Sequence, residues 1–266
     1  MKFGFFDDKE KEYVITSPAT PLPWINYLGN ENFFSLISNT CGGYSFYKDA
    51  KLLRLTRYRY NNVPADTDGR YYFIRHRNTV WTPAWQPVKT ELDSYECRHG
   101  LGYSRFTASK NKIQAELTAF VPLKESCEVN RLILTNHNTT EETIDLTSYV
   151  EFCFWNAVDD STNFQRNLSL GEVEVEESTI YHKTEYRERR NHFAYYTVNS
   201  PVAGFDTSRD DFLGVYGSIE HPETVYAGIS HNSVASGGAV IGSHQLKTHT
   251  ERPGEYQKSD FCTGLQ

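Results

Sequence analysis

The sequence has little of what marks a membrane protein, a nucleic-acid-binding protein or a disulfide-stabilised protein. No apolar run approaches the ~18 residues that a membrane-spanning helix requires. The net charge is −7, so the basic excess that favours binding to a phosphate backbone is missing. The five cysteines are odd in number and show no C-x-x-C spacing, which is typical of reduced thiols rather than of a disulfide framework or a zinc site. We therefore expect no nucleic acid, no membrane and no resident cofactor or metal.

The first residues also lack the apolar core of a secretory signal. Charged side chains follow almost at once, from Asp7 to Glu10. Together with the reduced thiols, this predicts a cytoplasmic protein.

Methionine is nearly absent, whereas aromatic residues are abundant: one Met stands against 18 Tyr and 16 Phe. Aromatic side chains favour pleated strands. Residues 113–119 alternate between apolar and polar. Within 144–154, Ile144, Leu146, Val150, Phe152 and Phe154 share one face and Asp145, Thr147, Tyr149 and Glu151 the other, while 131–135 form a shorter, more buried segment. Other expected strands cover residues 12–16, 33–38, 44–47, 53–58, 71–76, 103–109, 171–175, 180–183, 193–199 and 225–229. Many short strands without a long helix predict an all-β sandwich or barrel, with short turns near 159–164 and 208–212.

The C-terminal segment, residues 251–266, shows neither strand nor helix periodicity. A sandwich that lacked its last strand would leave a sheet edge unpaired. The sequence therefore predicts a β domain over residues 1–250, an atypical tail over 251–266, and a sandwich without its last strand, unless the tail is an ordinary frayed terminus.

The sequence contains none of four familiar catalytic motifs, namely G-x-S-x-G, G-x-x-x-x-G-K, G-x-G-x-x-G and H-E-x-x-H. The most informative polar segment is the loop of residues 163–167, which contains Gln165 and Arg166 between two asparagines. Amide and guanidinium groups donate and accept in fixed directions and match sugar hydroxyls. The alternative is a loop that hydrogen-bonds to itself.

Two further polar segments have structural explanations as well as chemical ones. Residues 186–191 carry three Arg and one Glu, which suits phosphate or carboxylate binding but also a solvated or subunit-interface strand. Cys97 and His99 share a strand face and could form a nucleophile pair, although Gly100 and Gly102 indicate a simple hairpin turn there.

Aromatic side chains offer another candidate, because they stack on pyranose rings as well as fill cores. The set comprises Trp24, Tyr27, Tyr58, Tyr60, Trp81 and Trp85. We expect most of them in the core, with the loop of residues 81–87 as the best exposed exception.

Several of these segments occur in an order that closely resembles the N-terminal domain of the cellobiose phosphorylases of glycoside hydrolase family 94. The resemblance covers roughly residues 1–245 and rests on residues 23–29, 39–47, 57–61, 95–103, 163–167, 181–191 and 204–210. It fades near Lys247, where the family continues into a further strand, a linker and a helical barrel.

The resemblance implies a β-supersandwich similar to galactose mutarotase, in a cytoplasmic homodimer that cleaves cellobiose with inorganic phosphate to α-glucose 1-phosphate and glucose. Phosphate is a co-substrate, and one carboxylic acid protonates the glycosidic oxygen. In the family this acid belongs to the helical barrel, so no catalytic residue carries over and the chain alone is predicted to be inactive. The expected partners are glucose or cellobiose and a second copy or the missing catalytic domain.

Gln165 and Arg166 match the family residues that hold the leaving-group glucose in the neighbouring subunit. The resemblance therefore makes them the predicted substrate-binding residues. Three alternatives remain open: a stand-alone carbohydrate-binding or interaction module, a phosphorylase domain for another β-linked disaccharide, and a mutarotase-like epimerase with His99, His182 and His192 as candidate acid and base.

Overall fold

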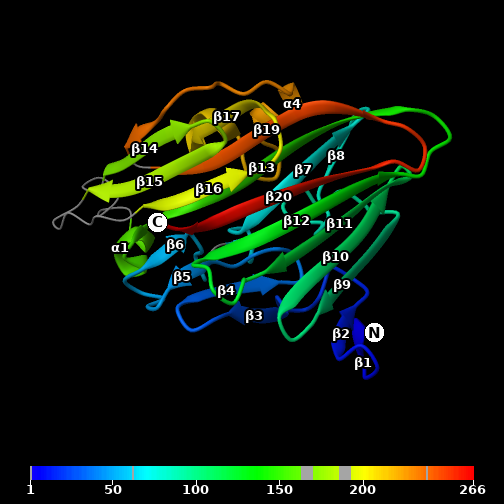
Figure 1. The fold of residues 1–266 in the computed structure, drawn as a ribbon, viewed down its shortest axis with the longest axis horizontal. Coiled ribbons are helices and arrows are strands. Elements are labelled where there is room, and N and C mark those ends of the chain that lie inside the picture. Colours follow the sequence, from blue (N-terminus) through cyan, green and yellow to red (C-terminus); the bar gives the residue numbers. More distant parts are fainter. Residues whose placement is uncertain (1, 62, 163–169, 186–192, 238) are drawn as a thin grey trace.

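The computed structural model describes residues 2–266 apart from 62, 163–169, 186–192 and 238. Two antiparallel sheets face each other, and the chain crosses several times from one sheet to the other (Figure 1). Within the described part, helices are confined to three short segments: α1 (Ala157–Ser161), α3 (Arg209–Leu213) and α4 (Glu223–Ala227). The all-β sandwich predicted from the sequence is confirmed.

The larger sheet contains eleven strands. In spatial order they are β1 (Gly4–Asp7), β2 (Glu12–Ile15), β9 (Ser94–His99), β10 (Tyr103–Lys110), β11 (Ile113–Phe120), β12 (Cys127–Asn136), β20 (Tyr256–Leu265), β16 (Ala194–Val198), β15 (Thr179–Glu185), β14 (Leu170–Glu176) and β18 (Ser236–Gly237). The strand β11 shows why the sequence pattern is reliable here. Its apolar residues Ile113, Ala115, Leu117 and Ala119 are all fully buried, and the polar residues between them are not.

The second sheet contains nine strands. They are β17 (Val202–Ser208), β19 (Val240–Glu251), β13 (Glu142–Trp155), β6 (Arg54–Thr56), β5 (Ser45–Tyr47), β4 (Phe33–Ser38) and β3 (Ile25–Gly29), with β7 (Arg70–His76) paired to β13 and β8 (Thr79–Trp81) paired to β7. The long strand β13 organises this sheet, because β19 pairs with one of its edges and β7 and β6 pair with the other.

A buried ion pair joins the two sheets. Glu128 of β12 is completely buried, and its Oε1 lies 2.7 Å from Nε of Arg70 on β7. The hydroxyls of Ser35 and Ser45 donate to the other carboxylate oxygen at 2.5 and 2.7 Å. Both oxygens of this carboxylate therefore have partners, which is what a buried charge requires.

A small second core lies on the other face of the nine-stranded sheet. There α3 and α4 pack beside β7 and β17, and the buried members include Phe73, Tyr149, Phe212 and Val225. The expectation of a strand over residues 225–229 is wrong, because Glu223–Ala227 forms α4. Pro222 precedes this helix, and Gly228 ends it in the left-handed conformation at φ 70°.

The expectations of an irregular tail over 251–266 and of a missing last strand are also wrong. Residues Tyr256–Leu265 form β20, which lies inside the larger sheet between β12 and β16 (Figure 1, red). Its alternation was hidden because the inward positions are Ser259, Phe261 and Thr263, and only one of these is apolar. The domain therefore continues past residue 250.

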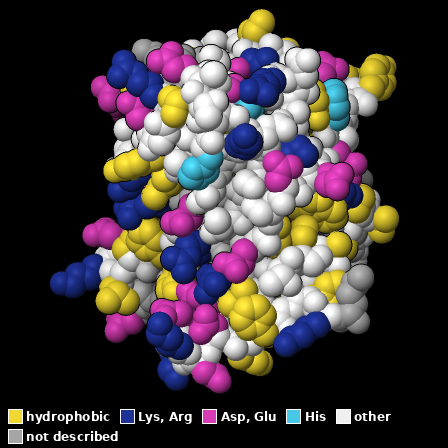
Figure 2. Space-filling model, turned by 90° about the vertical axis from the view of Figure 1, so that its right-hand side faces the viewer, with side chains coloured by type: hydrophobic (Ala, Val, Ile, Leu, Met, Phe, Trp, Pro, Cys, Tyr) yellow, Lys and Arg dark blue, Asp and Glu magenta, His cyan; other side chains and the backbone are white. Residues whose placement is uncertain are grey.

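Hydrophobic side chains also reach the surface. In the view of Figure 2 they form separate patches divided by Lys, Arg, Asp and Glu side chains. Leu101 and Leu123, for example, are 93% and 85% exposed. None of the described helices has the length and apolar character to cross a membrane.

The position of β20 leads to a stability prediction. Phe261 is completely buried and contacts the rings of Tyr72 and Tyr196 at centroid distances of 4.8 and 6.2 Å. We expect Phe261→Ala to lower the free energy of unfolding by about 3–5 kcal/mol in urea denaturation, because it leaves a cavity in the core. Tyr256→Ala, at an exposed position of the same strand, is the control and should change it by less than about 0.5 kcal/mol. Equal effects of the two variants would show that β20 is not part of the core.

Candidate functional site

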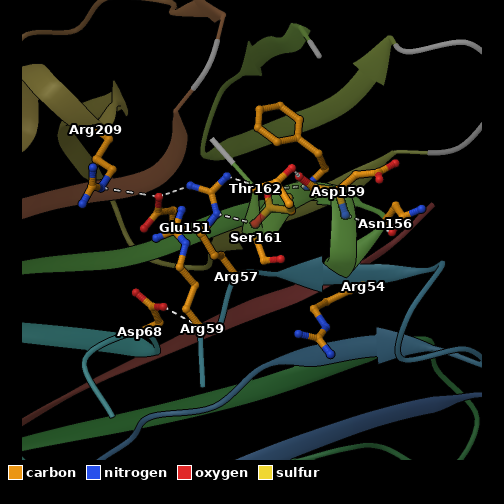
Figure 3. A network of polar contacts seen from close by, with 12 residues as sticks. Arg54, Arg57, Arg59, Asp68, Glu151, Asn156, Asp159, Ser161, Thr162 and Arg209 are labelled. Atoms are coloured by element: carbon orange, nitrogen blue, oxygen red, sulfur yellow. Dashed lines mark hydrogen bonds and ion pairs between the residues drawn. The ribbon is translucent and has the colours of Figure 1, made fainter. Parts of the chain in front are cut away.

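One arginine is buried between two carboxylates at the end of the second sheet. Arg57 follows β6 directly, and only 2% of it is exposed. Its Nε and Nη2 donate to the two carboxylate oxygens of Asp160 at 2.6 and 2.5 Å, while Nη1 pairs with Glu151 (Figure 3). The planar guanidinium thereby holds Asp160 in a bidentate pair and Glu151 at its other side.

This ion-pair cluster fixes the short helix α1. Asp160 is the buried residue of α1, and its Oδ1 also accepts from the backbone N–H of Phe154 at 3.3 Å. Asn156 caps the helix by accepting from the N–H groups of Val158 and Asp159 at 3.1 and 3.2 Å. Asp160 therefore ties this turn to β13 and to the residue that follows β6.

The segment that follows α1 carries the predicted sugar-binding residues. Gln165 and Arg166 lie outside the described residues, so the structure does not test them. It does place the residues just before them, because α1 ends at Ser161 and Thr162 is hydrogen-bonded back to Asp159 at 3.2 Å. The arginine-rich segment 186–191 and His192 lie outside the described part as well.

Further charged groups extend the cluster. The Nε of Arg209, at the start of α3, lies 3.4 Å from Glu151 Oε1. The backbone N–H of Arg59 donates to Asp68 at 2.8 Å. Burial raises the pKa of Asp68 to about 6, and the nearby Glu151 carboxylate adds to this shift. Glu151 and Asp160 are held by arginines, so the cluster is built to position the chain rather than to transfer protons.

A neighbouring buried carboxylate, Asp66, organises the turn beside this cluster. It accepts from the hydroxyls of Ser38 and Thr40 at 2.5 and 2.6 Å and from Tyr58 at 3.0 Å. Beyond Tyr58, the hydroxyl of Tyr60 donates to Tyr44 at 2.9 Å. These contacts position an aromatic surface rather than a reactive group.

The candidate aromatic set divides between core and surface. Trp81 is completely buried, Trp24, Tyr58 and Trp85 are half-buried, and Tyr27 and Tyr60 are 69% and 66% exposed. The expectation that the loop of residues 81–87 is the exposed exception is wrong, because nearly all of it is buried. Tyr27 and Tyr60 are the exposed members instead.

The Cys97–His99 pair has a structural role. Cys97 is completely buried, its Sγ lies 3.9 Å from the ring nitrogens of His99, and burial raises the pKa of the thiol. The ring of His99 is held by Ser104 Oγ at 2.9 Å and the Trp24 carbonyl at 3.1 Å. The turn at Gly100 is closed by a hydrogen bond from its N–H to the Tyr103 carbonyl at 2.9 Å. The hairpin interpretation therefore explains this motif.

The two described histidines of the epimerase alternative do not contact a common residue. His99 lies in β9, whereas His182 of β15 is stacked on Phe152 of β13 at a ring distance of 4.8 Å. Neither ring nitrogen of His182 has a hydrogen-bond partner among the described residues. Over the same residues, no three His, Cys, Asp or Glu side chains gather as metal ligands would.

The sequence analysis missed Arg57, Glu151 and Asp160. Glu151 was assigned to the polar face of an alternating strand, but from Leu146 to Trp155 both faces of β13 are buried. The available signal was a single carboxylate inside the run of Val150, Phe152, Cys153 and Phe154. A charge in such a run indicates a buried ion pair, whose partner only the fold identifies.

The two facing sheets are also found in solved sugar-handling proteins. A galactose mutarotase related enzyme from Lactobacillus acidophilus superposes with a TM-score of 0.52 at 6% identity, covering 91% of this chain and 97% of that one. An aldose epimerase homologue from C. elegans gives a TM-score of 0.52 at 10% identity, over 92% and 99% of the two chains. At these identities the likeness defines the fold, a galactose mutarotase-like supersandwich.

Sequence comparison is more specific than the fold. The profile described as "Glycosyl hydrolase 94, supersandwich domain" matches residues 11–266, so the chain belongs to glycoside hydrolase family 94. An N,N′-diacetylchitobiose phosphorylase from Vibrio proteolyticus is 37% identical over 100% of this chain, and a solabiose phosphorylase from Paenibacillus borealis is 30% identical over 95% of it. The chain spans about a third of each relative, 34% and 33% respectively.

The buried arginine predicts a large effect of one substitution. Arg57→Leu removes the bidentate partner of the buried Asp160 and leaves Glu151 with the longer contact to Arg209, and we expect the free energy of unfolding to fall by about 3–5 kcal/mol. The matched control is Arg131→Leu, because Arg131 pairs with Asp260 at 2.8 Å but is 41% exposed, and its loss should cost less than about 1 kcal/mol. Similar losses for both, measured by urea denaturation, would contradict a central role for the cluster.

His182 predicts a pH dependence of stability. Burial lowers its pKa to about 3, with the positive charge of Arg57 adding to the effect. Between about pH 6.5 and this value the unfolded state binds a proton that the folded state does not, so stability should fall as the pH falls through this range. His182→Phe keeps a ring against Phe152 and should reduce the slope by up to about 1.4 kcal/mol per pH unit.

The slope is obtained from denaturant unfolding at a series of pH values. The control is His137→Phe, which makes the same substitution at an exposed position. An unchanged slope in His182→Phe would show that this ring does not resist protonation.

Proposed function

We propose that this domain serves an inverting phosphorolysis of a β-linked disaccharide, with cellobiose giving α-glucose 1-phosphate and glucose. The observation that carries the proposal is the family match over residues 11–266, together with relatives that are disaccharide phosphorylases. In this reaction a phosphate oxygen forms a bond to the anomeric carbon from the face opposite the leaving sugar. The glycosidic bond breaks, and a carboxylic acid gives its proton to the departing oxygen.

The part proposed for this domain is to hold the leaving sugar. Gln165 and Arg166, on the loop that follows α1, donate to its hydroxyls in the active site of the partner copy of a cytoplasmic homodimer. The buried pairs of Arg57 with Glu151 and Asp160 support this, because they fix the start of that loop on the rigid sandwich. A binding loop needs such an anchor to keep its geometry.

A second candidate substrate is N,N′-diacetylchitobiose. Two relatives with this name, from Vibrio proteolyticus and Vibrio furnissii, are 37% and 38% identical to this chain. The two candidates differ in the N-acetyl groups of both sugars, so binding of glucose and of N-acetylglucosamine by the domain discriminates between them.

Calorimetric titration tests the sugar-holding role. We expect glucose to bind weakly, with a dissociation constant on the order of 1 mM. Gln165→Ala and Arg166→Ala should each weaken binding roughly ten-fold or more, since each removes directed hydrogen bonds to the sugar. The controls are Gln114→Ala on β11 and Arg131→Ala on β12, which remove the same types of side chain elsewhere in the domain. Loss of binding in the controls, or full binding in both loop variants, would rule the loop out.

The 266-residue chain alone should release no glucose 1-phosphate from cellobiose and phosphate. Holding one sugar without a positioned acid and a phosphate site gives little stabilisation of the transition state. Release above a protein-free blank would place a complete active site within these residues.

A further inference from the structure

A row of side chains crosses the outer face of the larger sheet at β14, β15, β16 and β20. Glu174 is opposite Tyr181, Tyr181 is opposite Tyr195, and Tyr195 is opposite Gly264. Residues directly opposite each other in a sheet project from the same face. One carboxylate and two phenols therefore lead to a glycine on a single face of four adjacent strands.

Gly264 determines how Tyr195 lies. A Cβ at this glycine would be only 2.6 Å from the Tyr195 hydroxyl, and that hydroxyl lies 3.6 Å from Sγ of Cys262 on the same strand. The phenol thus extends over β20 through the space that a side chain would fill. Tyr195 is half-buried, so part of its side chain stays accessible on this face.

Hydroxyl and amide groups surround this ring. Glu176 is opposite Thr179, and Thr179 is opposite Thr197, with the Thr179 hydroxyl donating to Thr197 at 2.9 Å. Together with Tyr181, Tyr195, Leu265 and Gln266 the two threonines line a hollow of about 350 Å³. A second hollow of about 380 Å³ shares Tyr181 and Gln266 and adds Glu174, Glu176 and Phe193. Because they share two lining residues, the two hollows adjoin, and we refer to them together as the groove.

The lining chemistry suits a neutral sugar. Aromatic ring faces pack on the apolar face of a pyranose, while threonine, glutamine and glutamate side chains pair with its hydroxyls. Glu174 and Glu176 are exposed at the rim, and Lys183 lies over the ring of Phe193 at 6.0 Å. The two carboxylates outnumber this one lysine among the described residues around the groove, so a phosphorylated or uronic sugar would meet a net like charge. This charge separates the expected ligand from an anionic one.

We propose that this groove is a second carbohydrate-binding site, which takes two adjacent rings of a neutral oligosaccharide, one of them stacked on Tyr195. The site does not involve Gln165 or Arg166, so it goes beyond the proposed function of the 163–169 loop. Because the groove lies on hydrogen-bonded strands of the larger sheet, we expect it to bind a saccharide without catalysing a reaction.

The test is an NMR titration, in which cellobiose is added to the isotopically labelled chain and the changes in its amide chemical shifts are recorded. We expect shifts for Thr179, Thr197 and Gln266. Tyr195→Leu should weaken this binding roughly ten-fold or more, because it removes the stacking ring. Tyr195→Phe keeps the ring and should bind within about two-fold of the unchanged chain, which separates stacking from any loss of folding.

Two comparisons distinguish this site from the loop. The double variant Gln165→Ala with Arg166→Ala should leave the groove shifts unchanged, so that failure of the loop proposal does not affect this one. Glucose 1-phosphate should shift these amides much less than cellobiose does. The proposal is overturned if cellobiose shifts none of the three amides, if Tyr195→Leu binds as well as Tyr195→Phe, or if the shifts follow protein concentration without sugar, as they would if a second copy covered the groove.

Discussion

The pairing of Arg57 with Glu151 and Asp160 is the interaction on which the candidate site depends. An arginine stays charged even when only 2% of it is exposed, so its burial is unfavourable unless carboxylates pair with it. Here one carboxylate belongs to the long central strand β13 and the other to α1. The energetic demand of the buried charge therefore fixes α1 against β13.

A second buried ion pair lies between the two sheets. Glu128 and Arg70, with two serine hydroxyls, form a fully satisfied polar link inside the core. Such links give the two sheets one relative arrangement, since sliding them would leave a buried charge without its partner. The apolar side chains around them provide most of the stabilisation, and the ion pairs select the geometry.

The sequence predicted the strands whose two faces differ. In β11 one face is buried and the other is not, so apolar and polar residues alternate and the pattern is readable. In β20 the inward residues are mostly serine and threonine, and in β13 both faces are buried, so alternation carries no information there. Helix α4 was missed because Thr224, Val225 and Tyr226 favour strands individually, whereas Pro222 and Gly228 bound a single helical turn.

The sequence by itself determined the β class, the aromatic-rich core and, through its order of motifs, the family to which the chain belongs. Tertiary structure alone decided which charges are buried and which face carries the exposed tyrosines. The physical reason is the distance along the sequence over which each signal acts. Alternation and turn residues involve neighbours along the chain, whereas Asp160, the partner of Arg57, is 103 residues away and is identified only once the strands are paired. For the same reason, no local pattern shows that Gly264 makes room for the ring of Tyr195.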